Sequence, residues 1–437
     1  MRYRFSDLMQ GCRNPLGRRQ LGVHLYSGAW PLWDALGRLY RRTCVKKVQV
    51  IAVVGSYGKT TTAGALSQAL NLKRLNTPGK GLSQVALSVL GMRPGQSASV
   101  IEVAINRRDQ MIRHAKTLRP NVVIITAIGS EHHRSLGDIA AIRDEKAKIL
   151  TGLVPGGIVI SNGDDAQVER MAIPPGARHI RFGFDAGCDV RARDVVDNWP
   201  HGLQFTLRVN AQTHWVRTRL LGRHMVYPIL AVFAVALADG CDLAETAAAV
   251  ASVPPAVARL QPVKLPGGAF LLRDEHKSSL ETIDAALDLL AQIPARRLVV
   301  LGDISEPLGS QGPIYRRLGG RIATMAAYAV FVGEHFRQYA RGAKRSGMPA
   351  ENLFNAGKSL DKAVDAVRRQ LQPGDVVLIK GRNTQRMERI SLALMGRTVN
   401  CKRVFCNAMG MRCEPCPMRK RGWKPTEIWP VGKKPRQ

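Results

Sequence analysis

The sequence has no run of 18 apolar residues, and aromatic residues make up only 5% of its 437 residues. A membrane-spanning helix needs about 20 mostly apolar residues, so none is expected. The N-terminal stretch MRYRFSDLMQGCRNP lacks the apolar core of a secretion signal. A hydrophobic content of 45%, rich in Ala, Val and Leu, is typical of a soluble α/β protein. These features predict a cytoplasmic chain of two or three domains.

Acidic residues are scarce: 33 Asp and Glu stand against 65 Lys and Arg, a net charge of +32. Residues 1–48 carry ten basic and two acidic side chains, and residues 401–437 carry the same numbers, so the two ends supply 8 + 8 = 16 of the excess charges. Basic ends favour polyanions such as nucleic acid, anionic lipid headgroups or a phosphorylated substrate. A general compositional bias explains the charge equally well.

The basic N-terminal segment also carries a helical pattern with two interpretations. One is a helix that lies in a membrane interface. The other is a helix packed on the following domain. The apolar positions at helical spacing are Trp30, Trp33, Leu36, Leu39 and Tyr40, and they lie beside Arg38, Arg41 and Arg42.

A near-match to a phosphate-binding P-loop occupies residues 53–62, which read VVGSYGKTTT. The common pattern G-x-x-x-x-G-K-[ST] has glycine where Val53 stands, but Gly55 lies within the same turn. The preceding run QVIAVV predicts a buried strand, and residues 59–72 have a helical pattern. A glycine turn between strand and helix directs backbone N–H groups at an anion. We therefore predict a nucleoside triphosphate site, with Lys59 on the outer phosphates and Thr60 on Mg²⁺.

The remaining pattern predicts an α/β fold: a central P-loop domain with a mostly parallel sheet, followed by a smaller Rossmann-like α/β domain. Strand-like and helical runs alternate from residue 49 to residue 161, and a second alternating series occupies residues 270–395. Between Arg178 and Leu221 the alternation of apolar residues favours antiparallel strands. The expected parts are a basic N-terminal helical segment (1–47), the central domain (48–256), the C-terminal domain (257–400) and a basic tail (401–437).

The order of these motifs resembles the Mur ligase family, closest to its MurF branch, over roughly residues 48–396. Members of that family are ATP-dependent, ADP-forming ligases that join a carboxylate to an amine through an acyl phosphate. Their P-loop is usually similar to Thr-Gly-x-x-Gly-Lys-Thr-Thr, without the distant first glycine. The stretches that carry the resemblance are VVGSYGKTTT, VIEVAI, RPNVVIITAIGSEHHRSLGD, IRDEKAKIL, LGRHMVYPILAVFAVAL, VARLQPVKLPGG, LLRDEHKSS, VVLGDISEPLG and VLIKGRNTQRME.

The resemblance implies a set of site residues. It implies that Lys146 is the lysine that becomes carbamylated, and that Arg259 and Lys380 serve domain closure or the phosphates. The implied nucleotide contacts are Gly55, Ser56, Gly58, Lys59, Thr60, Thr61 and Asp274. The implied Mg²⁺ ligands are Thr60, Glu102 and His132, and the implied catalytic residues are Lys59, Lys146, His132, Arg259 and Lys380.

The sequence departs from the family pattern where substrates are recognised. The 48 residues before the P-loop strand are too few for the family's uridine-nucleotide domain. The His-Asn-x-x-Asn element reads HMVYP at residues 224–228, and the asparagine-rich stretch after the C-terminal Asp reads DEHKSS at residues 274–279. Lys148 stands where the family has a glutamate. The phosphate chemistry is expected to be preserved, with altered nucleotide and acceptor recognition.

The C-terminal tail groups four cysteines in sixteen residues, with the spacing C-x4-C-x6-C-x2-C. In a cytoplasmic chain such a group predicts a metal site before disulfides. Zinc is the first expectation for four thiolates, and an iron–sulfur cluster is the alternative. The four residues are Cys401, Cys406, Cys413 and Cys416.

The sequence therefore predicts a cytoplasmic Mur-type ligase that uses ATP and Mg²⁺, with zinc at the tail and peripheral contact with an anionic membrane surface. The carboxylate substrate would be a peptidoglycan-like precursor, an amino-acid polymer or a specialised metabolite. Two rival functions stay open. One is a nucleotide-binding module that has lost ligase activity, and the other is a nucleic-acid-associated NTPase.

Overall fold

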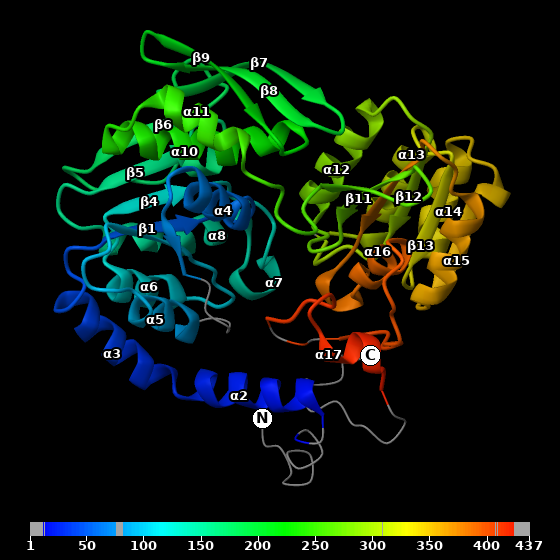
Figure 1. Cartoon of the computed structure of the whole chain (residues 1–437), viewed down its shortest axis with the longest axis horizontal. Coiled ribbons are helices and arrows are strands. Elements are labelled where there is room, and N and C mark those ends of the chain that lie inside the picture. The colour runs from blue at the N-terminus through cyan, green and yellow to red at the C-terminus, as the bar shows by residue number, and fades with distance from the viewer. Residues whose placement is uncertain are drawn as a thin grey trace. The chain divides into compact units, whose positions relative to one another are not determined.

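The computed structural model describes residues 12, 14–75, 82–307, 309–406, 408 and 410–423. Residues 1–11 of the expected N-terminal segment and residues 424–437 of the tail lie outside this set. The described residues form two compact units (Figure 1): Tyr26–Ala256, called here the P-loop unit, and Val257–Gln437 with the stretch up to Leu25, called the C-terminal unit. One division between the two units falls after Ala256, and the other after Leu25.

A nine-stranded sheet forms the P-loop unit, in the order β2-β3-β1-β4-β5-β6-β7-β8-β9. Strand β1 lies inside the sheet because its sequence, QVIAVV, offers apolar side chains to both covered faces. The strands are β1 (Gln49–Val54), β2 (Lys73–Arg74), β3 (Ala98–Glu102), β4 (Val122–Ile125), β5 (Ile158–Asn162), β6 (Arg178–Gly183), β7 (Val190–Asn198), β8 (Gly202–Val209) and β9 (Gln212–Thr218).

The pairings from β2 to β7 are parallel, and only β7, β8 and β9 pair antiparallel. The expectation of antiparallel strands from Arg178 onward was therefore wrong for β6, which continues the parallel sheet beside β5. Alternating side chains suit either pairing, since a strand that is covered on one face shows the same period in both. The antiparallel expectation holds for the rest of that segment.

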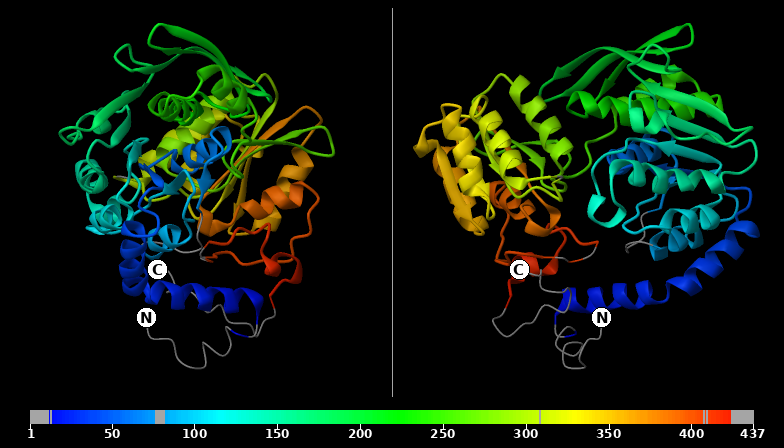
Figure 2. Two further views of the ribbon diagram at one scale, coloured as in Figure 1. Left: turned by 60° about the vertical axis from the view of Figure 1, so that its left-hand side comes forward. Right: turned by 180° about the vertical axis from the view of Figure 1, so that it is seen from behind.

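Helices cover both faces of this sheet (Figure 2). Helix α10 contacts α4, α11, β5 and β6, and its sequence VYPILAVFAVALAD is apolar on nearly every side because it is buried on nearly every side. On the other face α5 and α6 pack together, with α3 outside them. The helices are α3 (Trp30–Arg42), α4 (Lys59–Ala69), α5 (Leu82–Leu90), α6 (Gln110–Leu118), α7 (His133–Leu136), α8 (Ile139–Ala147), α9 (Ala166–Glu169), α10 (Val226–Asp239) and α11 (Leu243–Ala251).

The C-terminal unit contains a six-stranded sheet in the order β10-β11-β15-β12-β13-β14, parallel except where β10 pairs with β11. This arrangement agrees with the predicted second α/β series. The strands are β10 (Gln261–Lys264), β11 (Phe270–Asp274), β12 (Arg297–Leu301), β13 (Tyr328–Val332), β14 (Leu353–Gly357) and β15 (Val376–Lys380). The helices are α12 (Leu280–Gln292), α13 (Gln311–Ala323), α14 (Phe336–Arg345), α15 (Leu360–Gln370), α16 (Glu388–Leu394) and α17 (Pro417–Arg421), while α2 (Pro15–Gly28) begins in this unit and ends in the other.

Candidate nucleotide site and tail cysteine cluster

The turn between β1 and α4 explains why the P-loop needs its two glycines. Gly55 has φ +150° and Gly58 has φ +80°, both in the region that favours glycine. A Cβ atom on Gly55 would lie 2.0 Å from the Thr126 hydroxyl, so no larger residue fits. Gly58 is the N-cap of α4, which places the turn at the positive end of that helix. The local geometry is that of an anion-binding turn.

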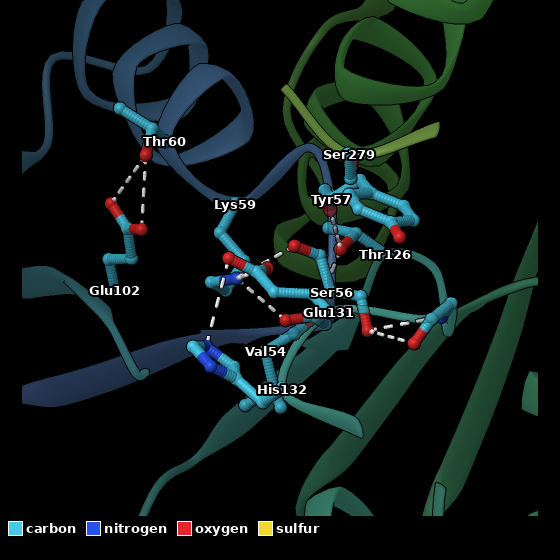
Figure 3. A network of polar contacts seen from close by, with 12 residues as sticks. Val54, Ser56, Tyr57, Lys59, Thr60, Glu102, Thr126, Glu131, His132 and Ser279 are labelled. Atoms are coloured by element: carbon cyan, nitrogen blue, oxygen red, sulfur yellow. Dashed lines mark hydrogen bonds and ion pairs between the residues drawn. The ribbon is translucent and has the colours of Figure 1, made fainter. Parts of the chain in front are cut away.

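Lys59 opens α4 and folds back over the turn that precedes it (Figure 3). Its ammonium group donates to the carbonyl oxygens of Gly55, at 2.7 Å, and Ser56, at 3.1 Å. Its nearest carboxylate oxygen belongs to Glu131, 3.8 Å away. The side chain is only 7% exposed, so its charge acts in a poorly solvated setting. A buried cation at this point is suited to hold a phosphate group.

Thr60 and Glu102, two of the expected Mg²⁺ ligands, lie in contact beside the turn. The Thr60 hydroxyl lies 3.0 Å and 2.9 Å from the two carboxylate oxygens of Glu102 (Figure 3). The β1–β3 register brings them together, since Val53 pairs with Glu102 at the carboxyl end of both strands. Hydroxyl and carboxylate oxygens are the donors that Mg²⁺ prefers. The pair therefore fits a magnesium ion held next to a bound phosphate.

Lys146 and His132 reach the same edge of the sheet from elements further along the chain. Lys146 is 1% exposed and donates to the Gly55 carbonyl oxygen at 2.9 Å. His132 has φ +71°, and its Nε2 lies 3.7 Å from a carboxylate oxygen of Glu131 (Figure 3). The burial of Lys146 is compatible with carbamylation, which needs a neutral amine. The P-loop unit thus brings Lys59, Thr60, Glu102, His132 and Lys146 to one edge.

Three residues of this site were missed by the sequence analysis: Arg74, Thr126 and Glu131. Arg74 Nη2 lies 3.5 Å from Glu102, on strand β2 of only two residues, which has no pattern of its own. Thr126 donates to the Tyr57 carbonyl oxygen at 2.5 Å and so fixes the P-loop against the end of β4. Glu131 stands next to the predicted His132, and only the fold shows its approach to Lys59. Of the three residues, only Glu131 had a signal in the sequence, namely its place beside His132.

Lys148 occupies the position where a glutamate was expected and has a structural role here. Its ammonium group lies 2.7 Å from Asp109 and 2.7 Å from Glu145. Hydrogen bonding to Asp109 and to Glu145 raises the pKa of Lys148 above its usual value. Glu145, which is buried, also accepts from the backbone N–H of Met111 at 3.2 Å. Lys148 therefore connects the end of α8 to the start of α6, two residues along the chain from Lys146.

In the C-terminal unit, Asp274 and Lys380 form a buried pair. They end the neighbouring parallel strands β11 and β15, and the register sets one directly beside the other. Lys380 donates to Asp274 and, at 3.0 Å, to the Lys277 carbonyl oxygen. Burial raises the pKa of Asp274 and lowers that of Lys380, against their mutual attraction. Arg259 adds a positive charge near both groups. The three predicted residues of this unit therefore share one cluster.

The stretch DEHKSS that follows β11 is largely buried. Glu275 is 3% exposed and its carboxylate lies 2.9 Å from the guanidinium of Arg273, itself 2% exposed. Burial lowers the pKa of His276 well below its usual value, so the ring is neutral at pH 7. The buried side chains of Arg273 and Glu275 lie in the interior of the C-terminal unit. Glu275 and His276 follow Asp274 directly in the sequence.

The four tail cysteines line one small cavity of about 20 Å³ in the C-terminal unit, room for about one water or ion. Arg389 Nη1 lies 3.5 Å from Cys401 Sγ. Burial and the neighbouring Glu388 carboxylate raise the pKa of the Cys413 thiol to about 12. Over the described residues, no three His, Cys, Asp or Glu side chains are arranged closely enough to hold a metal ion as they stand. The cysteines converge, but the side chains are not set as a formed metal site.

None of the described helices is both long enough and apolar enough to cross a bilayer. This agrees with the absence of long apolar runs in the sequence.

Comparison with known families identifies two domains in the chain. Residues 53–236 match the Mur ligase middle domain, and residues 258–383 match the Mur ligase glutamate ligase domain. Together the matches span 184 + 126 = 310 residues, more than half of the 437.

Curated relatives carry a common name. The chain is 31% identical over 351 residues to the UDP-N-acetylmuramoyl-tripeptide–D-alanyl-D-alanine ligase of Treponema pallidum, covering 78% of this chain and 73% of the relative. It is 28% identical over 310 residues to the enzyme of that name from Escherichia coli, covering 66% and 68%.

Solved structures agree with the sequence relatives. A MurF structure from Acinetobacter baumannii superposes with a TM-score of 0.75 at 25% identity, covering 84% of this chain and 81% of that one. The MurF ligase of Thermotoga maritima, solved in complex with ADP, has the same fold with a TM-score of 0.72 at 21% identity, covering 84% and 83%.

Proposed function

Because the chain belongs to the Mur ligase family, it is an ATP-dependent, ADP-forming acid–amino-acid ligase, and we propose that the residues gathered at the P-loop carry its chemistry. The single observation that supports this most is the convergence of Lys59, Thr60 and Glu102 at the carboxyl ends of β1 and β3. A cation for the phosphates and two oxygen donors for a magnesium ion stand side by side there. These are the parts that phosphoryl transfer requires.

The proposed reaction has two steps. A carboxylate oxygen of the first substrate attacks the γ-phosphorus of ATP, and the bond from that phosphorus to the ADP oxygen breaks, which gives an acyl phosphate and ADP. The amine of the second substrate then attacks the acyl carbon, and phosphate leaves with the oxygen that came from the carboxylate. The amine gives up a proton as the amide forms.

Residues of the P-loop unit have defined parts in the first step. Gly55, Ser56, Gly58 and Thr61 shape the turn that surrounds the phosphates, and Lys59 stabilises negative charge on the transferred group. Mg²⁺, held by Thr60 and Glu102 with His132 nearby, would neutralise phosphate oxygens during transfer. Lys146, buried against Gly55, would carry the carbamate. The position of these residues at one edge of the sheet supports these roles.

In the C-terminal unit we propose that Arg259, Asp274 and Lys380 serve the nucleotide or the acyl phosphate when this unit closes over the site. Their cluster is a pair of opposite charges with an additional arginine, so it keeps a net positive charge that is suited to phosphate. Closure would also keep water from the acyl phosphate, which water would otherwise hydrolyse.

The substrate pair is proposed to differ from that of the named relatives. Those relatives are named for a UDP-N-acetylmuramoyl-tripeptide and D-alanyl-D-alanine. In this chain the asparagine element is replaced, and its Tyr227 donates to Asp164 at 3.0 Å and packs edge-on against Phe184. We propose a peptide-like carboxylate and an amine, recognised by an altered surface. A peptidoglycan-like precursor fits, as do an amino-acid polymer and a specialised metabolite.

The two rival functions receive less support. A nucleotide-binding module would also use Lys59 and the Thr60–Glu102 pair, and it is suggested only by the altered asparagine elements. A nucleic-acid-associated NTPase is suggested only by the net charge and the cysteine-bearing tail. Amine-dependent ADP release separates the ligase from the first rival, and hydrolysis stimulated by nucleic acid would favour the second.

For the tail we propose that Cys401, Cys406, Cys413 and Cys416 bind one structural zinc ion after a small rearrangement of their side chains. The support is the shared cavity, together with the spacing along the chain. Four thiolates leave no open position for a substrate, so such an ion would stabilise the tail and would take no part in catalysis.

The proposed location is the cytoplasm, with peripheral contact at an anionic membrane surface through the N-terminal helices. The support is their basic charge and the exposed side chains of α3.

The test of the ligase is ADP release by the full chain against a panel of carboxylate and amine pairs. At least one pair should give ADP release that depends on both partners. ADP release that needs neither partner, or only nucleic acid, would overturn the proposal. Lys116→Ala, an exposed lysine on α6, serves as the matched control for substitutions at Lys59.

A further inference from the structure

Helix α3 turns Asp34 and Arg41 toward the protein and its three leucines toward solvent. Asp34 is 8% exposed and Arg41 is 4% exposed, whereas Leu32, Leu36 and Leu39 are 55%, 41% and 61% exposed. A helix on the surface of a soluble protein normally has the opposite arrangement. The exposed side, made of Leu32, Ala35, Leu36 and Leu39, is called here the α3 leucine face.

The inner side of α3 is fixed by polar contacts. Arg41 donates to the carbonyl oxygens of Leu118 at 2.8 Å, Val45 at 2.6 Å and Arg119 at 3.0 Å. Asp34 accepts from the Thr117 hydroxyl at 2.5 Å. These contacts tie α3 to the end of α6.

Close packing reinforces this orientation. A Cβ atom on Gly37 would lie 3.3 Å from the Ala86 carbonyl oxygen of α5, so the two helices approach closely there. Turning α3 to bury its leucines would break a buried network of hydrogen bonds to charged groups, which costs more than the leucines would gain. The α3 leucine face is therefore a fixed feature of the P-loop unit.

The surroundings of the α3 leucine face are basic. Arg42 at the end of the helix and Lys46 and Lys47 just after it are exposed. Between residues 14 and 48 the sequence has seven basic residues and one acidic residue, Asp34, whose carboxylate is bound inward by Thr117 and Arg38. Figure 1 shows α3 along the outer side of α5 and α6, at the edge of the P-loop unit. An apolar stripe with basic neighbours is the composition of a helix that lies in a membrane interface.

We propose that the α3 leucine face docks on an anionic lipid bilayer, with the leucines in the boundary between headgroups and acyl chains and the basic residues on the headgroup phosphates. A second copy of the chain is a poorer occupant. A symmetric dimer through this face would bring Arg42, Lys46 and Lys47 of both copies together, with no exposed acid between residues 14 and 48 to face them. This inference rests on the proposed peripheral location and is independent of the ligase chemistry.

The test is co-sedimentation of the full chain with vesicles of phosphatidylcholine and phosphatidylglycerol in a 7:3 ratio. The variant Leu32→Ser/Leu36→Ser/Leu39→Ser should bind these vesicles roughly tenfold more weakly or worse, because each leucine contributes apolar burial. The control Val196→Ser/Trp215→Ser removes two equally exposed apolar residues, 56% and 53%, elsewhere on the P-loop unit and should bind normally. Vesicles of phosphatidylcholine alone should bind the unaltered chain roughly tenfold more weakly.

A second variant keeps the proposal testable if the leucine variant does not fold. Lys46→Glu/Lys47→Glu lies outside α3 and should weaken binding to anionic vesicles while leaving the helix intact. ADP release in solution should be unchanged in every variant, which separates a failure of membrane docking from a failure of the ligase assignment. Equal vesicle binding by the leucine variant and the control would overturn the proposal. So would a dimer of the unaltered chain that the leucine variant turns into a monomer.

Discussion

The buried lysines of the two units have different hydrogen-bond partners. In the P-loop unit, the hydrogen bonds that Lys59 makes at the turn go to the neutral carbonyl oxygens of Gly55 and Ser56, and its nearest carboxylate, Glu131, lies 3.8 Å away. In the C-terminal unit, Lys380 bonds Asp274 directly. The ammonium group of Lys59 is therefore placed to hold a phosphate, whereas that of Lys380 is already hydrogen-bonded to a carboxylate. A buried lysine can therefore be part of a binding site or part of the support, and its neighbours distinguish the two.

The largest effect is expected at Lys59. Lys59→Ala should lower ADP release roughly a thousandfold, because a preorganised cation opposite the transferred phosphate is lost. Its free energy of unfolding should fall little, since the nearest carboxylate oxygen, of Glu131, lies 3.8 Å from Lys59, too far for a hydrogen bond. Steady-state ADP release and a denaturant titration measure the two. A folded Lys59→Ala enzyme with normal turnover would remove the contrast between the units.

Lys380→Met should lose stability as well as ADP release, because Lys380 is half of a buried pair and is also proposed to serve the phosphates. Removing one partner of a buried pair leaves Asp274 uncompensated, which should cost about 3–5 kcal/mol of unfolding free energy. The double variant Asp274→Leu/Lys380→Met should recover much of that loss. Denaturant titration of the unaltered chain, the two single variants and the double variant gives the coupling energy between Asp274 and Lys380. Full stability of Lys380→Met would mean that the pair is not a structural support.

Lys146→Ala should lower ADP release about a hundredfold through loss of the carbamate, and a short carboxylic acid should restore part of the activity. Lys148→Ala, two residues further on, is the matched control and should keep its turnover while losing a little stability. Activity of Lys146→Ala at the level of the control would contradict the carbamate.

The smallest effect on catalysis is expected at the tail. Cys413→Ser/Cys416→Ser should release zinc and loosen the tail, yet leave ADP release within about twofold, since the proposed ion is structural. Elemental analysis of the purified chain measures the metal. Four titratable tail thiols with no bound zinc or iron would exclude the site.

Sequence patterns sufficed where the chemistry is local. The strand, glycine turn and helix of the P-loop are contiguous, so residues 49–69 could be predicted without the fold. The neighbour relation between Asp274 and Lys380 depends on the pairing of β11 with β15, more than a hundred residues apart, and only family resemblance suggested it.

Other features had no sequence signal. Arg74 lies on a strand of two residues, too short for a pattern. The orientation of α3 was unpredictable because Asp34 and Arg41 look like surface residues until their hydrogen bonds to α6 are known. The parallel pairing of β6 likewise follows from sheet topology, which alternation along one strand does not encode.

Transfer of ¹⁸O from the carboxylate substrate to phosphate, measured once the panel has identified a substrate pair, decides whether the chain forms an acyl phosphate. An acyl phosphate requires that each phosphate released during amide formation carry one oxygen atom from the carboxylate, and mass spectrometry of the phosphate would show it. We predict one labelled oxygen per phosphate in the unaltered chain. Phosphate without label, formed together with the amide, would contradict the account.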